Sequence, residues 1–386
     1  MGIQKIIHVI GTPDIKVITG IRRSGKSCLL LQFMEYINQT DKDANIIFVD
    51  FNSLSAEPYL EYHALNNYIE GQYKSNKNNY VCIDEVQMCS GFEKAINSLH
   101  SSMKYDIYIT DSNAFLLSSD LATLFTGRTY EIKVFPFSYK ECLKYYDGQY
   151  SLDRYVREGG MPGTLLYREK DDKYKYIRDV FETLIIKDIT NKYSIRNKEV
   201  IHDLAYFMMD NISSLTSANN ISKSLANANI KITDKTIKLY MQYLKDSYLF
   251  YKVRRYDIKR KKCLATNDKY YLSDHSFRYA IIGTKNMDYG RVYENIVAIE
   301  LLRRGYEVYV GKLYKKEVDF VAMKQNEKIY FQVSDDISNQ KTFDREVTSL
   351  LEIQDAYPKI LLANTHHDEY QYEGVKIIDI EEWLKL

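Results

Sequence analysis

The sequence has few cysteines and prolines and no long apolar run. Its five cysteines are scattered and include no C-x-x-C pair, which argues against a disulfide framework or a zinc site and favours a reducing cytoplasm. No window approaches 18 consecutive apolar residues, and no signal-peptide pattern opens the chain, so we expect a cytoplasmic protein with no membrane span. The net charge of +1 lacks an excess of either sign, so any surface for nucleic acid must be local.

The 386 residues are 45% hydrophobic and 27% charged, a composition that is typical of globular proteins. A chain of this length is expected to form two or three domains, each with its own core. We predict an α/β fold in three parts, with boundaries at residues 1–150, 151–280 and 281–386.

The segment from Gly20 to Ser27 reads Gly-Ile-Arg-Arg-Ser-Gly-Lys-Ser and fits the phosphate-binding pattern G-x-x-x-x-G-K-[ST]. A β-branched run at 16–19 predicts a buried strand before it, and the apolar segment 28–37 predicts a helix after it. In this context the backbone N–H groups and the positive end of the helix would surround a triphosphate. Lys26 is expected to reach the β- and γ-phosphates, and the Ser27 hydroxyl to hold Mg²⁺. The predicted ATP-binding residues are Gly20, Arg22, Arg23, Ser24, Gly25, Lys26, Ser27 and Cys28.

A pair of acids follows an apolar strand further along the chain. After a second predicted strand at 45–51, the run Tyr80-Val81-Cys82-Ile83 ends in Asp84 and Glu85, the form of a Walker B segment. Asp84 at the carboxyl end of its strand would hold the Mg²⁺ shell, and Glu85 would orient and polarise the attacking water.

Two further polar positions lie near the ends of predicted strands. After the strand at 106–110, Ser112 or Asn113 could contact the γ-phosphate or the water, although an Asn or Ser helix cap before residue 114 explains the pattern equally well. Arg128, before the strand at 130–134, could stabilise the transition state within its own chain or in a neighbouring subunit of a homo-oligomer. A surface arginine is the alternative.

Five motifs occur here in the order of a known family. They are Arg22–Ser27, Asp84–Gln87, Thr110–Ala114, Gly127–Arg128 and Pro136–Glu141. The chain resembles a prokaryotic family of AAA-type ATP-binding proteins, and the resemblance implies a parallel-sheet ATPase domain and a second, C-terminal domain of unassigned function. Asp111 stands where that family has glycine. An added carboxylate there would repel the γ-phosphate or bind metal, which argues against fast hydrolysis but not against nucleotide binding.

The middle of the chain predicts helices and a hairpin. The glycine-rich segment 158–163 is the predicted hinge out of the ATPase domain. Helices are expected at 174–188, 199–210, 217–226 and 234–249, and strands at 249–253 and 269–272. This order favours a winged helix-turn-helix whose recognition helix is 234–244.

The predicted hairpin carries a basic cluster with only Asp257 as an acid. On a wing such a cluster could follow the phosphates of double-stranded DNA, and the alternative is a solvated hairpin tip. The candidate DNA-binding residues are Lys252, Arg254, Arg255, Lys259, Arg260, Lys261 and Lys262.

The last hundred residues alternate helix and strand in an order that resembles the restriction-endonuclease fold. Asp319 matches the first acid of that fold and Glu294 its helix acid, but Gln332 and Ser334 occupy the positions of the Glu-x-Lys pair. Glutamine holds hard cations poorly and serine carries no charge, so we expect nuclease activity to be lost. Asp335 and Asp336 lie close enough in sequence to substitute.

These patterns together predict a Mg²⁺-dependent ATPase of the AAA type that couples its nucleotide state to DNA or partner binding by the C-terminal half. The alternative is a nucleotide-switched regulatory or scaffold module that hydrolyses ATP slowly or not at all. An ATP-driven nuclease is a third alternative.

Overall fold

The computed structural model describes residues 2–113, 125, 127–227, 232–264, 267–284 and 287–386. The described chain forms two compact units. The first unit contains Met1–Phe135 together with Asp246–Tyr248, and the second contains Pro136–Lys245 and Leu249–Leu386.

The first unit is built on a parallel sheet, which has five strands within the described chain. Its strands are β1 Ile15–Thr19, β2 Ala44–Asp50, β3 Asn78–Asp84, β4 Asp106–Asp111 and β5 Thr129–Lys133. The order across the sheet is β2-β3-β4-β1-β5, and every neighbouring pair is parallel. Strand β4 therefore separates β1, which precedes the glycine loop, from β3, which ends in the acid pair.

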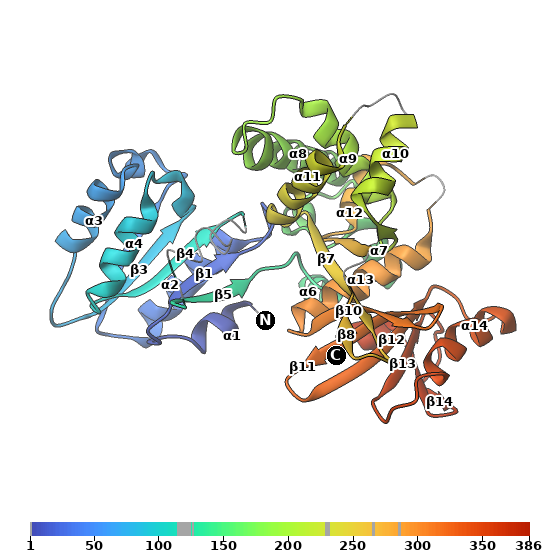
Figure 1. The fold of residues 1–386 in the computed structure, drawn as a ribbon. Coiled ribbons are helices and arrows are strands. Elements are labelled where there is room, and N and C mark those ends of the chain that lie inside the picture. Colours follow the sequence, from blue (N-terminus) through green and yellow to red (C-terminus); the bar gives the residue numbers. More distant parts are fainter. Residues whose placement is uncertain (1, 114–124, 126, 228–231, 265–266, 285–286) are drawn as a thin grey trace. The chain divides into compact units, whose positions relative to one another are not determined.

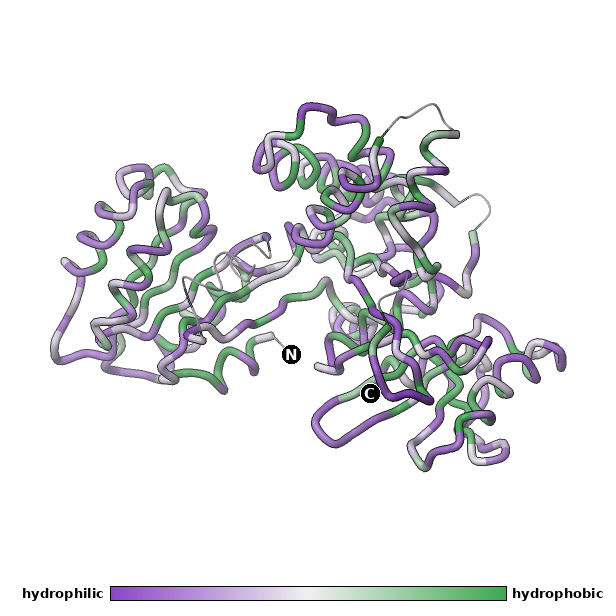
Figure 2. Tube along the Cα trace, in the orientation of Figure 1, coloured by the Kyte–Doolittle hydropathy of each residue, from purple (hydrophilic) through white to green (hydrophobic). Residues whose placement is uncertain are grey.

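Helices cover both faces of this sheet (Figure 1). Helices α3 (Tyr62–Gly71) and α4 (Phe92–Ser101) pack on one face, whereas α1 (Gly2–Ile7) and α2 (Lys26–Thr40) pack on the other. Two 3₁₀ turns, η1 (Leu54–Tyr59) and η2 (Val86–Met88), complete the described connections. All five residues of β1 are buried, as expected for a central strand covered by helices on both faces. Figure 2 shows hydrophobic residues along the strands and hydrophilic residues over the connecting turns.

The second unit begins with helices. They are α6 Tyr139–Tyr145, α7 Leu152–Glu158, η4 Pro162–Leu166, α8 Lys170–Thr183, the π-helix η5 Leu184–Asn191, α9 Lys198–Asp210, α10 Ala218–Asn227, α11 Asp234–Asp246 (whose last residue clusters with the first unit) and α12 Ser276–Ile281. Apolar periodicity predicted α9, α10 and α11 to within a few residues. The prediction of one helix at 174–188 differs from the structure, where α8 ends at Thr183 and continues into η5.

A ten-stranded mixed sheet, counted over the described residues, forms the rest of the second unit. Its strands are β6 Leu215–Thr216, β7 Phe250–Asp257, β8 Lys262–Cys263, β9 Asp268–Leu272, β10 Glu307–Leu313, β11 Lys316–Lys324, β12 Glu327–Ser334, β13 Lys359–Ala363, β14 Tyr370–Tyr372 and β15 Val375–Asp379. The order is β14-β15-β13-β12-β11-β10-β7-β9-β6, and β8 pairs with β7. Helices α13 (Tyr289–Arg303), α14 (Gln340–Leu351) and α15 (Ile380–Lys385) accompany it.

The predicted hairpin forms, but it is not a free wing. Strands β7 and β9 pair as predicted, yet β7 continues to Asp257 and its outer half pairs in parallel with β10. The predicted middle and C-terminal domains therefore share one sheet. The winged-helix arrangement is not confirmed, because the strand expected to lie in solvent has a ladder partner on each side. The division at residue 280 stays a prediction.

The glycine pair of the predicted hinge lies inside the second unit. The Gly160 N–H donates to Asp274 Oδ2 at 2.7 Å, and a Cβ on Gly160 would lie 1.9 Å from the Phe137 carbonyl oxygen. These glycines thus permit close packing, whereas the chain first passes from one unit to the other at Phe135 and Pro136.

Candidate nucleotide site

The glycine loop follows β1 directly and has the backbone that its sequence predicts. Gly20, Arg23 and Gly25 have positive φ angles of 149°, 65° and 99°. A Cβ on Gly20 would lie 2.1 Å from the Val134 carbonyl oxygen, so no other residue fits there without a backbone shift. The loop then enters α2 at Lys26.

The glycine loop holds a cluster of hydrogen-bond donors whose positions suit an anion. Lys26 is 4% exposed, and its ammonium group donates to the Gly20 and Ile21 carbonyl oxygens at 2.9 and 3.1 Å. Helix α2 begins after Gly25, which has no side chain to cap the first amides. The Ser24 hydroxyl is buried and has no hydrogen-bond partner among the described residues. Since buried polar groups are normally paired, these donors fit the oxygens of a bound phosphate group.

The predicted acid pair is held by a residue of the neighbouring strand. Asp84 is 3% exposed at the end of β3, and its Oδ1 accepts a hydrogen bond of 2.5 Å from the Thr110 hydroxyl. The same Thr110 oxygen accepts from the Glu85 N–H at 2.9 Å. On the other side, the Asn52 amide lies 3.5 Å from Asp84 Oδ2. Thr110 therefore orients the Asp84 carboxylate and holds the backbone of Glu85, a role that its sequence position does not reveal.

Glu85 leaves the strand in a strained conformation. Its φ is 53°, a left-handed value that costs a non-glycine residue about 1 kcal/mol or more. Its half-buried carboxylate accepts a hydrogen bond from the Gln87 amide, and the Ser112 hydroxyl lies 3.5 Å from the same carboxylate oxygen. Ser112, one of the two predicted γ-phosphate contacts, thus lies beside the acid pair.

Strand register brings the loop and the acids to one edge of the sheet. Thr19, the last residue of β1, lies opposite Asp111 of β4, and Ile18 lies opposite Thr110. Because Thr110 bonds to Asp84 on the next strand, two strand spacings, about 9–10 Å, separate the start of the glycine loop from Asp84. Both lie at the carboxyl ends of parallel strands, where open α/β sheets bind ligands.

Asp111 is fully buried beside this edge. Its Oδ1 accepts a hydrogen bond of 2.9 Å from the Asn113 N–H, so one carboxylate oxygen shapes the turn after β4. A contact of Asn113 with the γ-phosphate stays a prediction. The alternative cap would serve a helix at 114–117, which lies outside the described residues.

Arg128 lies at the opposite edge of the sheet. It is exposed, and its carbonyl oxygen accepts from the Ile15 N–H at 2.7 Å, where β1 and β5 begin. The five residues of β1 span about 13–16 Å from this edge to the glycine loop, which exceeds the reach of an arginine side chain. The structure therefore does not bring Arg128 to the nucleotide site of its own chain.

In the second unit the residues predicted to resemble a nuclease centre make other contacts. Glu294 on α13 accepts hydrogen bonds from Lys269 Nζ at 2.9 Å and from the Tyr271 hydroxyl at 2.6 Å. Lys269 is 3% exposed and also lies 2.7 Å from Glu317. Burial raises the pKa of Glu294. Burial opposes the charged form of Lys269, but the negative charges of Glu294 and Glu317 outweigh this effect, so the pKa of Lys269 is raised. The sequence predicts Lys269 only as the start of a strand, and it gives no signal for this buried ion pair on β9, the strand next to the sheet edge.

Gln332 takes part in a second buried network. Its carbonyl oxygen accepts from the Asp319 N–H at 3.3 Å, and its amide donates to Glu346 at 2.8 Å. Burial raises the pKa of Asp319 well above its usual value. Within the described ranges no group of three or more His, Cys, Asp or Glu side chains is arranged to hold a metal ion. The resemblance to a nuclease fold is not confirmed, and the loss of cleavage activity stays a prediction.

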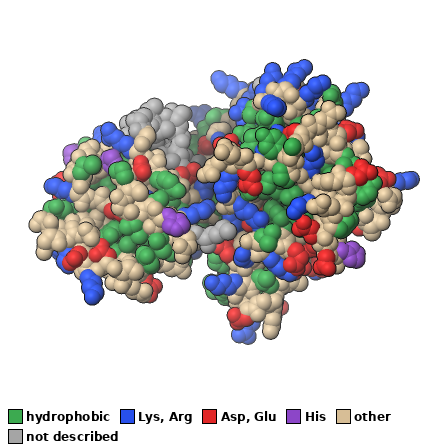
Figure 3. All heavy atoms as spheres, turned by 90° about the horizontal axis from the view of Figure 1, so that it is seen from below, with side chains coloured by type: hydrophobic (Ala, Val, Ile, Leu, Met, Phe, Trp, Pro, Cys, Tyr) green, Lys and Arg blue, Asp and Glu red, His purple; other side chains and the backbone are tan. Residues whose placement is uncertain are grey.

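The basic hairpin residues are mostly exposed. Lys252 pairs with Asp268 at 2.8 Å, and Arg260 lies 3.9 Å from Asp257. Arg255 is half-buried, and its Nε has no hydrogen-bond partner in the part of the chain that is described. On the face shown in Figure 3, basic and acidic side chains are intermingled, in agreement with the net charge of +1.

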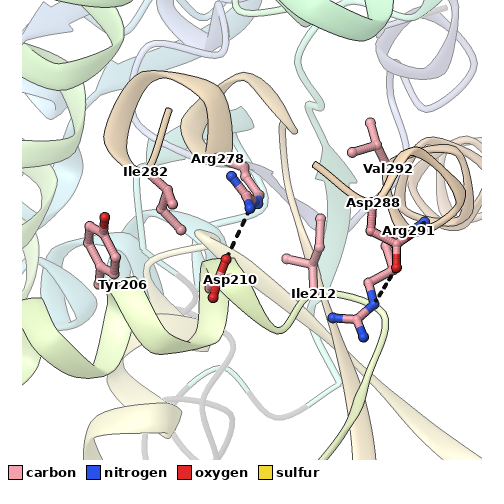
Figure 4. Close-up of a pocket in the computed structure, with 8 residues that line it drawn as sticks. All are labelled: Tyr206, Asp210, Ile212, Arg278, Ile282, Asp288, Arg291 and Val292. Carbon is pink, nitrogen blue, oxygen red and sulfur yellow. Dashed lines mark hydrogen bonds and ion pairs between the residues drawn. The ribbon is translucent and has the colours of Figure 1, made fainter. Parts of the chain in front are cut away.

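A separate cavity of about 520 Å³ lies in the second unit (Figure 4). Two arginines line it, and each is paired with an aspartate: Arg278 with Asp210 at 3.0 Å, and Arg291 with Asp288 at 3.1 Å. Because both guanidinium groups are already paired with carboxylates, this cavity offers less positive charge to a triphosphate than the glycine loop does. None of the residues predicted for a site from the sequence lines it.

The strand order, the glycine loop and the acid pair define a P-loop domain of the AAA type. An AAA domain family matches residues 12–143, and a domain of unknown function (DUF8612) matches residues 149–288. The matches fall on successive parts of the chain, and the first contains every residue of the glycine loop and the acid pair.

Relatives of the chain align along nearly its whole length. An uncharacterized protein of Haemophilus influenzae is 36% identical over 391 residues, which cover 99% of this chain and 97% of the relative. The uncharacterized protein MJ1544 of Methanocaldococcus jannaschii is 27% identical and covers 96% of this chain and 86% of its own length. The chain belongs to the family of the Haemophilus protein, in which the P-loop domain and the second unit occur together.

Two solved structures match the chain with low TM-scores. The Walker-type ATPase PABY2304 of Pyrococcus abyssi is 16% identical with a TM-score of 0.46, over 72% of this chain and 94% of that one. AMPPCP-bound DnaA from Aquifex aeolicus is 15% identical with a TM-score of 0.32, over 63% of this chain and 85% of that one.

Within the described residues, no helix has the length and apolar character needed to cross a bilayer.

Proposed function

We propose that this protein binds ATP with Mg²⁺ on the Gly20–Ser27 loop and hydrolyses it. The observation that carries the proposal is the Thr110 hydroxyl, which bonds to Asp84 and Glu85 at the sheet edge where the glycine loop begins. If the glycine loop were only a structural turn and the two acids only faced solvent, a buried hydroxyl bonded to both acids would have no role.

Each residue has a role that follows from its position. The loop amides and Lys26 would bind the β- and γ-phosphates, and Lys26 would exchange its two carbonyl contacts for phosphate oxygens. Ser27 and Asp84 would hold Mg²⁺, which when bound neutralises charge on the phosphate oxygens. Glu85 would orient the attacking water and accept its proton, and its contacts with Gln87 and Ser112 hold the carboxylate in place.

Steady-state phosphate release tests the hydrolysis step. Glu85→Gln keeps the shape of the side chain but removes the base, so we expect release to fall by about 100-fold or more while ATP still binds. Equal release by the two proteins would show that Glu85 is not the catalytic residue.

A second candidate function is a nucleotide-switched regulatory or scaffold module with slow turnover. The buried Asp111 favours it, because a carboxylate beside the γ-phosphate position opposes the accumulation of negative charge there. Asp111→Gly, the residue of the family pattern, would then raise phosphate release. Unchanged release would remove this argument for a slow switch.

We also propose that nucleotide state controls nucleic-acid or partner binding by the second unit. The exposed basic side chains between Lys252 and Lys262 support this proposal. We expect duplex DNA to shift in gels at low salt, and the triple change of Arg260, Lys261 and Lys262 to alanine to weaken the shift at all sequences alike. Absence of any shift at low salt would end the proposal for duplex DNA.

A further inference from the structure

Two turns at one end of the large sheet present basic and aromatic side chains together. The turn between β7 and β8 contains Lys259 and Lys261, Lys262 begins β8, and the turn between β10 and β11 contains Tyr314. Strands β7 and β10 are parallel neighbours up to the register pair Asp257 and Lys312, so both turns leave the sheet at the same end. Lys259 Nζ lies 4.8 Å from the centroid of the Tyr314 ring, and this ring is 63% exposed.

A second exposed tyrosine lies beside other basic side chains. Tyr357 is 44% exposed and lines a cavity of about 540 Å³ together with Lys324 and Lys328. Lys328 Nζ lies 4.8 Å from the centroid of the Tyr357 ring. Burial lowers the pKa of Lys328, and the positive charge of Lys261 lowers it further while Asp355 opposes the shift. Lys328 Nζ also lies 5.7 Å from the centroid of the Tyr256 ring on β7, so the Tyr357 cavity adjoins the strand that leads into the β7–β8 turn.

The charge of this surface is only partly compensated. Arg260 lies near Asp257, and Lys328 near Asp355 at 3.5 Å. In contrast, Lys259, Lys261 and Lys262 are exposed and form no ion pair with the described residues. Three uncompensated lysines at the tip of one hairpin attract a polyanion and would release its counterions on binding.

We infer that the β7–β8 turn, Tyr314 and the Tyr357 cavity form a binding surface for single-stranded nucleic acid. The lysines would follow the phosphates, and the two exposed rings would stack on unpaired bases. A duplex hides the faces of its bases, so it would use the lysines but not the tyrosines. The cavity beside Tyr357 has the size of a small-ligand pocket and can receive one base.

This inference deepens the proposed nucleic-acid binding by the second unit and does not depend on ATP hydrolysis. Fluorescence anisotropy tests this inference. The three labelled ligands are a mixed-sequence DNA strand, the same strand annealed to its complement, and the RNA of the same sequence. The full-length protein is expected to bind a single strand more tightly than the duplex. Equal or tighter binding of the duplex would overturn the inference, and the DNA and RNA strands show which backbone is preferred.

Variants of the two rings separate stacking from charge. Tyr314→Ala and Tyr357→Ala are each expected to weaken single-strand binding roughly five- to 100-fold and to leave duplex binding within about twofold. Tyr370→Ala, at a 43% exposed tyrosine on β14, is the matched control and should change neither. Lys261→Ala with Lys262→Ala should reduce the salt slope for the single strand by about 1.4. Single-strand affinity that survives loss of both rings would contradict the inference.

Phosphate release measured on the same samples distinguishes this failure from that of the ATPase proposal. Protein that hydrolyses ATP but does not bind a single strand refutes only the binding surface. Protein that binds a single strand through both tyrosines without hydrolysing ATP refutes only the hydrolysis. Because the rings are exposed, the circular dichroism spectrum of each variant should match that of the wild type. If a variant does not fold, the conservative Tyr→Leu change replaces it, and the same loss of single-strand affinity is expected.

Discussion

The Thr110 hydroxyl offers the sharpest perturbation of the proposed site. Thr110→Val keeps the shape of a fully buried side chain but removes the hydrogen bond to Asp84 and the acceptor of the Glu85 N–H. A bond to a charged group contributes about 1.5–3 kcal/mol and a neutral bond about 0.5–1.5 kcal/mol. We therefore expect the free energy of unfolding of the variant to fall by about 2–4 kcal/mol in urea titrations followed by circular dichroism.

The same change should weaken the use of metal. An Asp84 carboxylate without its orienting donor would bind Mg²⁺ about 10- to 100-fold less well, so phosphate release should require correspondingly more Mg²⁺ for half-maximal rate. Thr110→Ser retains the hydroxyl and loses one buried methyl group, which costs about 1 kcal/mol, and its Mg²⁺ requirement should match the wild type. If Thr110→Val and Thr110→Ser have the same Mg²⁺ requirement, the hydroxyl does not position Asp84 for metal.

Three further changes test other parts of the structure. Gly20→Ala would force a Cβ to 2.1 Å from a backbone oxygen, so the thermal shift caused by Mg²⁺ and ATP should disappear; a retained shift would contradict the described loop. Lys269→Met would leave Glu294 buried without its cation and should lower the unfolding free energy by about 3–5 kcal/mol in urea, whereas a change below about 1 kcal/mol would refute the ion pair. Burial lowers the pKa of His275 in the folded protein, so the unfolded chain takes up a proton at this histidine more readily. The free energy of unfolding therefore falls as the pH drops below the pKa of the unfolded histidine. Between about pH 7.5 and pH 5.5 the wild type should lose up to about 1.4 kcal/mol more than His275→Gln, and an equal loss would show that His275 does not titrate on unfolding.

Local pattern predicts the strands of the first unit and helix α2, because each has a strong local signal. Short β-branched runs marked its strands, and the motif residues stand next to them in sequence. The match to an AAA domain confirms the P-loop class that these motifs predicted. The orienting hydroxyl of Thr110 could not be predicted in this way, since it depends on which strand lies beside β3.

Pairing between distant strands accounts for the main differences. Nothing in the sequence from 250 to 257 indicates that β7 pairs with β10, which begins at Glu307, and so the hairpin resembled a free wing. Arg128 was considered as a catalytic residue because its motif follows the others in order, but the parallel arrangement of β1 and β5 places it at the far edge. The Gly159–Gly160 pair has the composition of a flexible hinge, and the same composition also permits close approach of two backbones.

Equilibrium binding of ATP with Mg²⁺, measured by titration calorimetry for the wild type and for Lys26→Ala, tests the central claim most directly. The change removes the charged donor that would contact the β- and γ-phosphates, so the dissociation constant should rise about 10- to 100-fold, with one site per chain in the wild type. Equal affinity of the two proteins would show that ATP does not bind on the Gly20–Ser27 loop.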